Sequence, residues 1–159
     1  MPLVDTLKSN SFKSHIQSSQ GNWINLAYVR KSPGNEDEVT RARLTTYMAE
    51  SLRKYCHCRK IFVSDGSRID APILARDING GPKVFDGNIQ GMFSYLAFST
   101  KKIRLYVIDY AGLSTDPNDI QRVIKIYKNI KELTVVHRSD IEILSHLNLK
   151  NNTVIKKFE

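Results

Sequence analysis

The chain has 159 residues and 41% of them are hydrophobic, a length and composition typical of one folded domain and unlike those of a disordered protein. Its 24 lysines and arginines outnumber 16 aspartates and glutamates, and the net charge of +8 favours a polyanionic partner such as nucleic acid. The sequence has no apolar run long enough to cross a membrane, no signal-peptide pattern and only two cysteines. We therefore expect an intracellular protein with no membrane association.

The chain is expected to begin with a flexible polar arm over residues 1–22, which are rich in Ser, Asn, Gln and Lys. A single domain is expected over residues 23–159. It opens with an apolar run that predicts a strand over residues 24–30, and the Pro33-Gly34 turn follows that run.

The next elements are a helix and a second strand. Asn35 and Glu38 form a capping pair that predicts the start of the helix. Its buried face is predicted from apolar residues at helical spacing, which are Leu44, Met48, Leu52 and Tyr55. The second strand is predicted over residues 60–64, and a short helical stretch follows around residues 72–76.

Strong turn residues at positions 79–82 (Asn-Gly-Gly-Pro) precede another amphipathic helix. The apolar residues of that helix are Ile89, Met92, Phe93, Leu96 and Ala97. A third strand is predicted over residues 102–108 and ends at Asp109. Asp116 and Pro117 are typical of the cap and first position of a following helix.

A fourth strand is predicted over residues 131–137, and Ser139 with Glu142 predicts a capping box for a final helix through Leu147. Strands and helices alternate throughout. The predicted fold class is therefore α/β, a Rossmann-like three-layer domain with a central, mainly parallel sheet of about four strands and helices on both faces. Function in such sheets gathers at the carboxyl ends of the strands.

Two kinds of site are not supported by the sequence. No glycine-rich phosphate-binding motif follows the first strand, so we expect no nucleotide cofactor. Cys56-His57-Cys58 would need two further ligands to hold zinc, and the other histidines are isolated, so we expect no metal.

Three segments carry a resemblance to a known family. They are Tyr28-x-Arg30-x-Ser32, Asp70-x-Pro72-x-Leu74, and the run from Leu113 to Asp119 (Leu-Ser-Thr-Asp-Pro-Asn-Asp). In this order, and at these strand ends, they resemble the catalytic domain of the serine recombinases, the resolvases and invertases. The resemblance implies a resolvase-like fold with Ser32 as the nucleophile that attacks a DNA phosphodiester, and with Tyr28 and Arg30 in the catalytic site. Arg30 would grip the phosphate.

The departures from the family pattern concern the arginines that stabilise charge on the phosphate. Ala71, Gly112 and Thr115 stand at three arginine positions, and Glu36 stands where the family has glutamine. Removing one preorganised donor costs about 10²–10³ in rate, so catalysis is expected to be impaired. Three other cations are candidates to replace the lost arginines, namely Lys31, Arg68 and Arg76.

The expected function is a degenerate resolvase-like domain that binds DNA or serves as an interaction module, with Arg30, Lys31 and Arg68 contacting DNA. A homodimer or larger assembly is expected. Family members continue into a long helix and a DNA-binding module, whereas this sequence ends soon after its fourth strand, so paired strand exchange is not expected.

Two alternatives stay open: an active serine recombinase or nickase that uses Ser32, and a protein-interaction module with no nucleic-acid role. If the resemblance to the recombinases holds, Ser32, Asp109 and the loop at 111–115 should share one edge of the sheet. The strand order should then follow the recombinase pattern.

Overall fold

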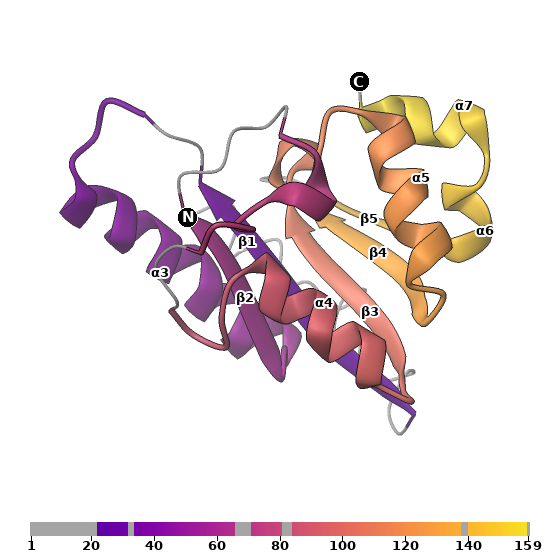
Figure 1. Cartoon of the computed structure of the whole chain (residues 1–159), viewed down its shortest axis with the longest axis horizontal. Coiled ribbons are helices and arrows are strands. Elements are labelled where there is room, and N and C mark those ends of the chain that lie inside the picture. Colours follow the sequence, from indigo (N-terminus) through magenta and orange to yellow (C-terminus); the bar gives the residue numbers. More distant parts are fainter. Residues whose placement is uncertain (1–21, 32–33, 66–70, 81–83, 138–139, 159) are drawn as a thin grey trace.

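The computed structural model describes residues 22–31, 34–65, 71–80, 84–137 and 140–158. Its centre is a five-stranded sheet in the order β2-β1-β3-β4-β5 (Figure 1). The strands are β1 (Trp23–Lys31), β2 (Lys60–Asp65), β3 (Lys102–Ile108), β4 (Ile130–Val136) and β5 (Ile141–Ser145). The first four are parallel, at the positions that the sequence predicts, and β5 runs antiparallel to β4.

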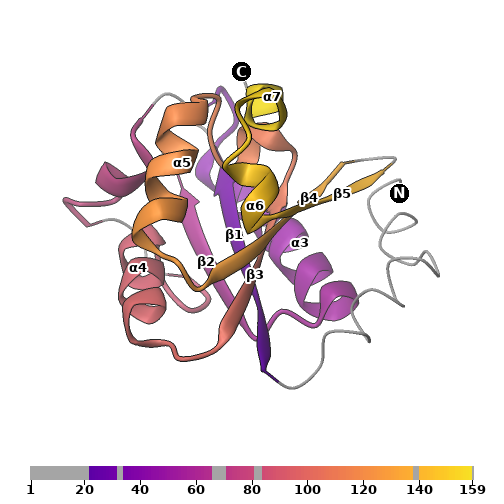
Figure 2. The ribbon, with the colours of Figure 1, turned by 90° about the vertical axis from the view of Figure 1, so that its right-hand side faces the viewer.

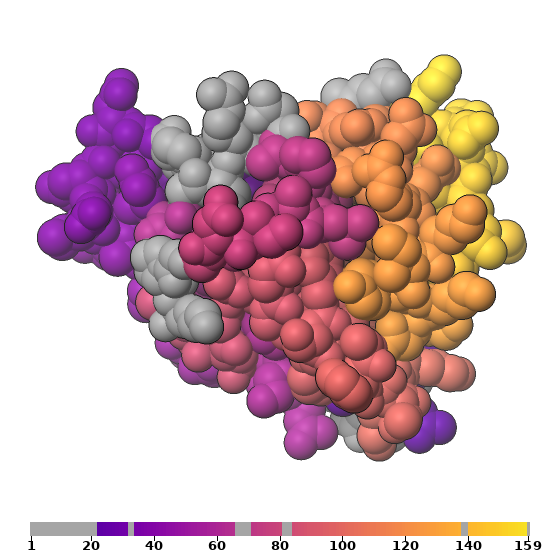
Figure 3. Space-filling view, in the orientation of Figure 1, coloured from indigo at the N-terminus to yellow at the C-terminus, as the bar shows by residue number. Residues whose placement is uncertain are grey.

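Helices cover both faces of the sheet, so the predicted α/β three-layer class is confirmed (Figure 2). One face packs on α3 (Glu38–Cys56). The other packs on η1 (Ile73–Ala75), α4 (Ile89–Phe98) and α5 (Pro117–Ile126), and α4 and α5 hide much of the sheet in Figure 3. Two apolar clusters fill the layers because alternate strand residues point to opposite faces: Leu26 and Tyr28 lie in one cluster, and Ala27 and Val29 in the other.

The helix after β1 differs from its prediction in its start and its buried face. Its cap is Asp37, whose carboxylate accepts from the backbone N–H of Thr40, and not Asn35. Leu44 is 44% exposed, whereas Thr45 and Ala49 are buried on the sheet side. The small side chains of Thr45 and Ala49 let the helix lie close to the sheet, a packing effect that hydrophobicity alone does not reveal. The predicted face of α4 is confirmed except for Ala97, which is exposed.

The predicted final helix from Ser139 is wrong. Residues 141–145 form β5, which pairs with β4 through registers such as Leu133↔Leu144. Ile141 and Ile143 favour a strand, and the open edge of β4 supplies hydrogen-bonding partners for it. The capping box lies at Ser145 and Asn148.

Three short helical segments follow β5 and complete the fold. They are α6 (His146–Leu149), α7 (Asn152–Ile155) and η3 (Lys156–Phe158). They return along α5 and bury Leu149, Ile155 and Phe158 in the core on that face. Among the described residues, no helix is both long and apolar enough to cross a membrane.

Candidate functional site

The carboxyl ends of β1 and β3 are joined by the side chain of Arg30. Its Nε and Nη2 atoms donate to the carbonyl oxygen of Ala111 at 3.1 and 2.8 Å. Ala111 lies in η2 (Tyr110–Gly112), which follows β3. The end of the first strand and the start of the loop at 111–115 therefore share one edge of the sheet. Ser32 and Arg68 lie outside the described residues.

Tyr28 lies beneath this edge and is fully buried. Arg76 donates from Nη1 to the phenol oxygen of Tyr28 at 3.3 Å and from Nε to the carbonyl oxygen of Ala71 at 3.1 Å. Burial raises the pKa of Tyr28, although the Arg76 guanidinium opposes that rise. A fully buried neutral phenol cannot contact DNA, so Tyr28 is suited to hold Arg76 in place.

Arg76 is itself only 2% exposed, although the sequence makes it a candidate to replace a lost arginine. Its charge is close enough to Arg30 to lower the pKa of Arg30, with burial of Arg30 as the larger cause. Two guanidinium groups are therefore held near each other under the carboxyl edge.

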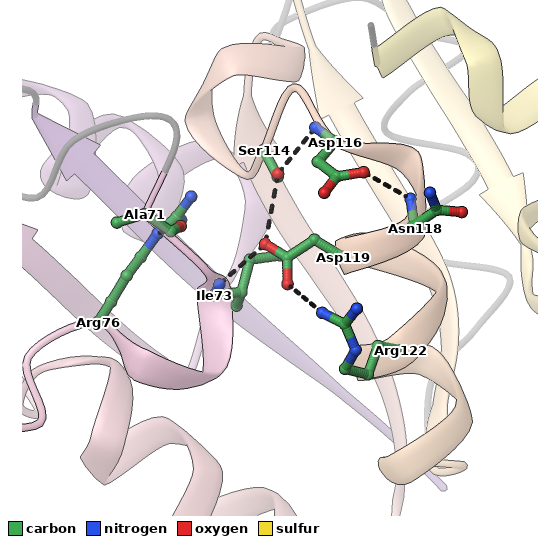
Figure 4. A network of polar contacts seen from close by, with 8 residues as sticks. All are labelled: Ala71, Ile73, Arg76, Ser114, Asp116, Asn118, Asp119 and Arg122. Carbon is green, nitrogen blue, oxygen red and sulfur yellow. Dashed lines mark hydrogen bonds and ion pairs between the residues drawn. The ribbon is translucent and has the colours of Figure 1, made fainter.

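A second buried contact joins the segments after β2 and β3 (Figure 4). The Asp119 carboxylate is 3% exposed and accepts from the backbone N–H of Ile73 at 2.8 Å. The Ser114 hydroxyl lies 3.5 Å from the same carboxylate oxygen and also accepts from the backbone N–H of Asp116. Arg122, more than half exposed, pairs with the other oxygen at 3.3 Å. Asp119 thus fixes η1 against the first turn of α5.

The other predicted cation at this edge is already paired. Lys31 Nζ lies 2.8 Å from Glu36 Oε1, and the hydrogen bond from Lys31 lowers the pKa of Glu36. Arg41 lies 3.7 Å from Glu36 and 3.8 Å from Asp65. Glu36 therefore belongs to a mixed group of charges and is not an isolated anion facing a phosphate.

Residues near the ends of β3 and β4 form a polar cluster that the sequence analysis missed. His137 Nδ1 lies 3.2 Å from Asp109 Oδ1, and Lys157 Nζ donates to Glu142 at 2.5 Å. Tyr110 also donates to Glu142, and burial with this contact raises the pKa of Tyr110 to about 12. Asp109 and His137 could be noticed in the sequence because each follows the end of a strand. Glu142 could not, because the predicted helix from Ser139 assigns it to the wrong element.

No group of three or more metal-ligating side chains occurs within the part of the chain that the structure describes. Cys56 and Cys58 are buried, and burial raises the pKa of both thiols. His57 between them ends α3 in a left-handed backbone conformation. This tripeptide spans the carboxyl end of α3.

Comparison of the sequence with protein-family models and with curated proteins gives no match.

Proposed function

We propose that this chain is a resolvase-like domain, similar to the catalytic domain of serine recombinases, that binds DNA and has lost most of its catalytic power. DNA would approach the edge where β1 and β3 end. Arg30 and Lys31 would meet its phosphates, with Arg68 as a third cation from outside the described residues. A homodimer or larger assembly would bring two such edges to one duplex.

The observation that carries this proposal is the meeting of three segments far apart in the sequence. Arg30 reaches Ala111 across 81 positions, and Asp119 reaches Ile73 across 46 positions. Arg76, just after the second segment, reaches Tyr28 in the first across 48 positions. Each contact joins one residue of the family resemblance to a residue in or beside another of the three segments, as expected for segments that build one site.

The same geometry supports the impaired catalysis. Phosphoryl transfer needs fixed cations where charge develops on the phosphate oxygens. Ala71, Gly112 and Thr115 supply no charge at three positions of this edge. Two N–H groups of Arg30 donate to the Ala111 carbonyl, so fewer N–H groups are available to a phosphate.

Salt-dependent binding of duplex DNA tests this function. We expect log K to fall linearly with log salt, by about 0.9 for each phosphate contacted. Lys31→Gln should make the slope shallower by about one unit, because it removes one phosphate contact. The matched control Lys54→Gln, on the exposed side of α3, should leave the slope unchanged. Absence of binding at low salt, or equal effects of the two variants, would refute the proposal.

A second candidate is a protein-interaction module with no nucleic-acid role. The pairing of Lys31 with Glu36, with Arg41 lying between Glu36 and Asp65, favours it, because this part of the edge carries mixed charge. This candidate predicts no DNA affinity at low salt. It also predicts self-association that sedimentation velocity detects and that duplex DNA does not change.

A working recombinase or nickase would form a covalent phosphoserine at Ser32 when given nicked or gapped duplex DNA. We expect no adduct by mass spectrometry, because three arginine positions are empty of charge. The triple change Ala71→Arg, Gly112→Arg and Thr115→Arg, compared with the native chain, tests whether these positions are what limits the reaction. An adduct on the native chain would establish the enzymatic alternative.

A further inference from the structure

An open pocket of about 630 Å³ lies between α5, the first residues of β4 and α6, away from the carboxyl edge. These three elements meet on one side of the molecule (Figures 1 and 2). Its rim carries four exposed lysines, which are Lys125 on α5, Lys128 between α5 and β4, Lys131 on β4, and Lys150 just after α6. The proposed DNA-binding function uses none of them.

The positive charge of this rim is not neutralised by neighbouring acids. Within the described residues, none of the four lysines forms an ion pair. Glu132, next to Lys131 on β4, points to the opposite face of the sheet and pairs with Arg104 at 2.6 Å. The carboxyl end of α5 contributes about half a negative charge, which offsets only a small part of four ammonium groups.

The lining of the pocket is mostly apolar and its walls are held in place. Ile124 and Leu149 are buried there. Gln121 donates to the carbonyl oxygen of Leu149 at 3.4 Å and to Asn152 Oδ1 at 3.3 Å, which ties α5 to the segment after β5. The pocket is therefore preformed, as small-molecule sites usually are.

His146 adds a directional group to the pocket wall. Its Nδ1 lies 3.0 Å from the carbonyl oxygen of Ile130. A carbonyl oxygen only accepts, so Nδ1 carries the proton in this contact. Nε2 is then the ring atom left for a ligand in the pocket.

We propose that this pocket binds an organic phosphate of mononucleotide size. Its volume falls within the range of about 300–1,000 Å³ that is typical of small-molecule sites. The ammonium groups of the lysines would hold the phosphates as point charges, and the aliphatic stems of these lysines with the His146 ring would pack against the organic part. This differs from a glycine-rich phosphate loop, which the sequence lacks, and it stands independently of the proposed DNA-binding function.

Calorimetric titrations of the full chain at one fixed ionic strength test this inference with ATP, tripolyphosphate and adenosine as probes. We expect ATP to bind about tenfold or more tightly than tripolyphosphate, because only ATP has an organic part that covers the apolar lining of the pocket. Adenosine should bind far more weakly because it lacks phosphates. Equal affinity for ATP and tripolyphosphate would overturn the proposal, since it would show a general attraction of anions to a basic protein. Binding of oligonucleotides without binding of ATP would overturn it too.

A pair of matched variants locates the binding. Lys128→Gln/Lys131→Gln should lower the ATP affinity by about tenfold or more, because each lost charge-assisted contact weakens binding severalfold. Lys54→Gln/Lys156→Gln removes the same charge from exposed sites elsewhere and should leave the affinity within about twofold. ATP should also shift the ring NMR signals that disappear in His146→Gln. Equal losses in both variants, or unmoved His146 signals, would contradict the assignment.

Discussion

The carboxylate of Asp119 accepts a hydrogen bond from the backbone N–H of Ile73 in the buried interior, and this contact joins α5 to the segment that follows β2. The two residues belong to different segments of the proposed recombinase resemblance, so the contact holds those two segments together. The donor is a buried backbone N–H, and leaving such a group without an acceptor is costly.

Removing this acceptor should destabilise the protein. Asp119→Ala leaves the Ile73 N–H buried without a partner and should lower the free energy of unfolding by about 1–3 kcal/mol, measured by urea denaturation. Asp119→Asn keeps an acceptor oxygen and should cost less. Arg122→Gln removes only the half-exposed partner and should cost about 0–1 kcal/mol. Asp119→Ala with wild-type stability would show that the contact is not formed.

The backbone of Asp109 gives a second prediction. Its φ of 58° and ψ of 162° lie close to a region that is almost confined to glycine. Asp109→Gly and Asp109→Ala both remove the carboxylate that faces His137, so their comparison isolates the backbone. We expect the glycine variant to be about 1 kcal/mol more stable than the alanine variant in urea denaturation. The reverse order would mean that the backbone at Asp109 is not strained.

The decrease in the free energy of unfolding at acid pH should depend on Glu142. Burial would raise its pKa, but hydrogen bonds from Lys157 and Tyr110 outweigh burial and lower it below the ordinary value. A lowered pKa in the folded state stabilises the fold above the unfolded pKa of about 4.3, and this contribution is lost as the pH falls through the folded value. Lys157→Gln should therefore be less stable than the native chain above about pH 5, with the difference shrinking in stronger acid.

The neighbouring lysine provides the control for that measurement. Lys156→Gln removes the same charge without touching Glu142, so its stability should follow the native curve at a constant offset from pH 2.5 to 6. A pH-independent difference for Lys157→Gln as well would argue against a coupling between Lys157 and Glu142.

The sequence predicts the parallel part of the sheet because its strands are apolar runs that end at turn residues, and it predicts the start of α5 because Asp116 and Pro117 form a local signal. It mispredicts β5 because Ser139 and Glu142 carry a local helix signal, whereas the pairing of Ile141 with Val136 of β4 is a tertiary effect.

Some features of the candidate site can also be predicted from the sequence, and others cannot. The sequence makes Tyr28 and Arg30 candidates because their spacing resembles a family motif. The contact of Arg30 with Ala111 could not be predicted, because a backbone carbonyl is the acceptor and every residue has one. The burial of Arg76 was hidden for a similar reason: a guanidinium leaves water only when the fold supplies partners, here Tyr28 and the Ala71 carbonyl.

An NMR titration of the isotope-labelled chain with duplex DNA, following each backbone amide, tests whether DNA binds at the carboxyl edge of β1 and β3. We expect the amides of Lys31, Ala111 and Gly112 to shift together and to saturate at one affinity, because these residues share the carboxyl edge of β1 and β3. The amides of Lys128 and Lys131 should move far less. Shifts confined to those two lysines, or no shifts at low salt, would contradict a DNA-binding role for this edge.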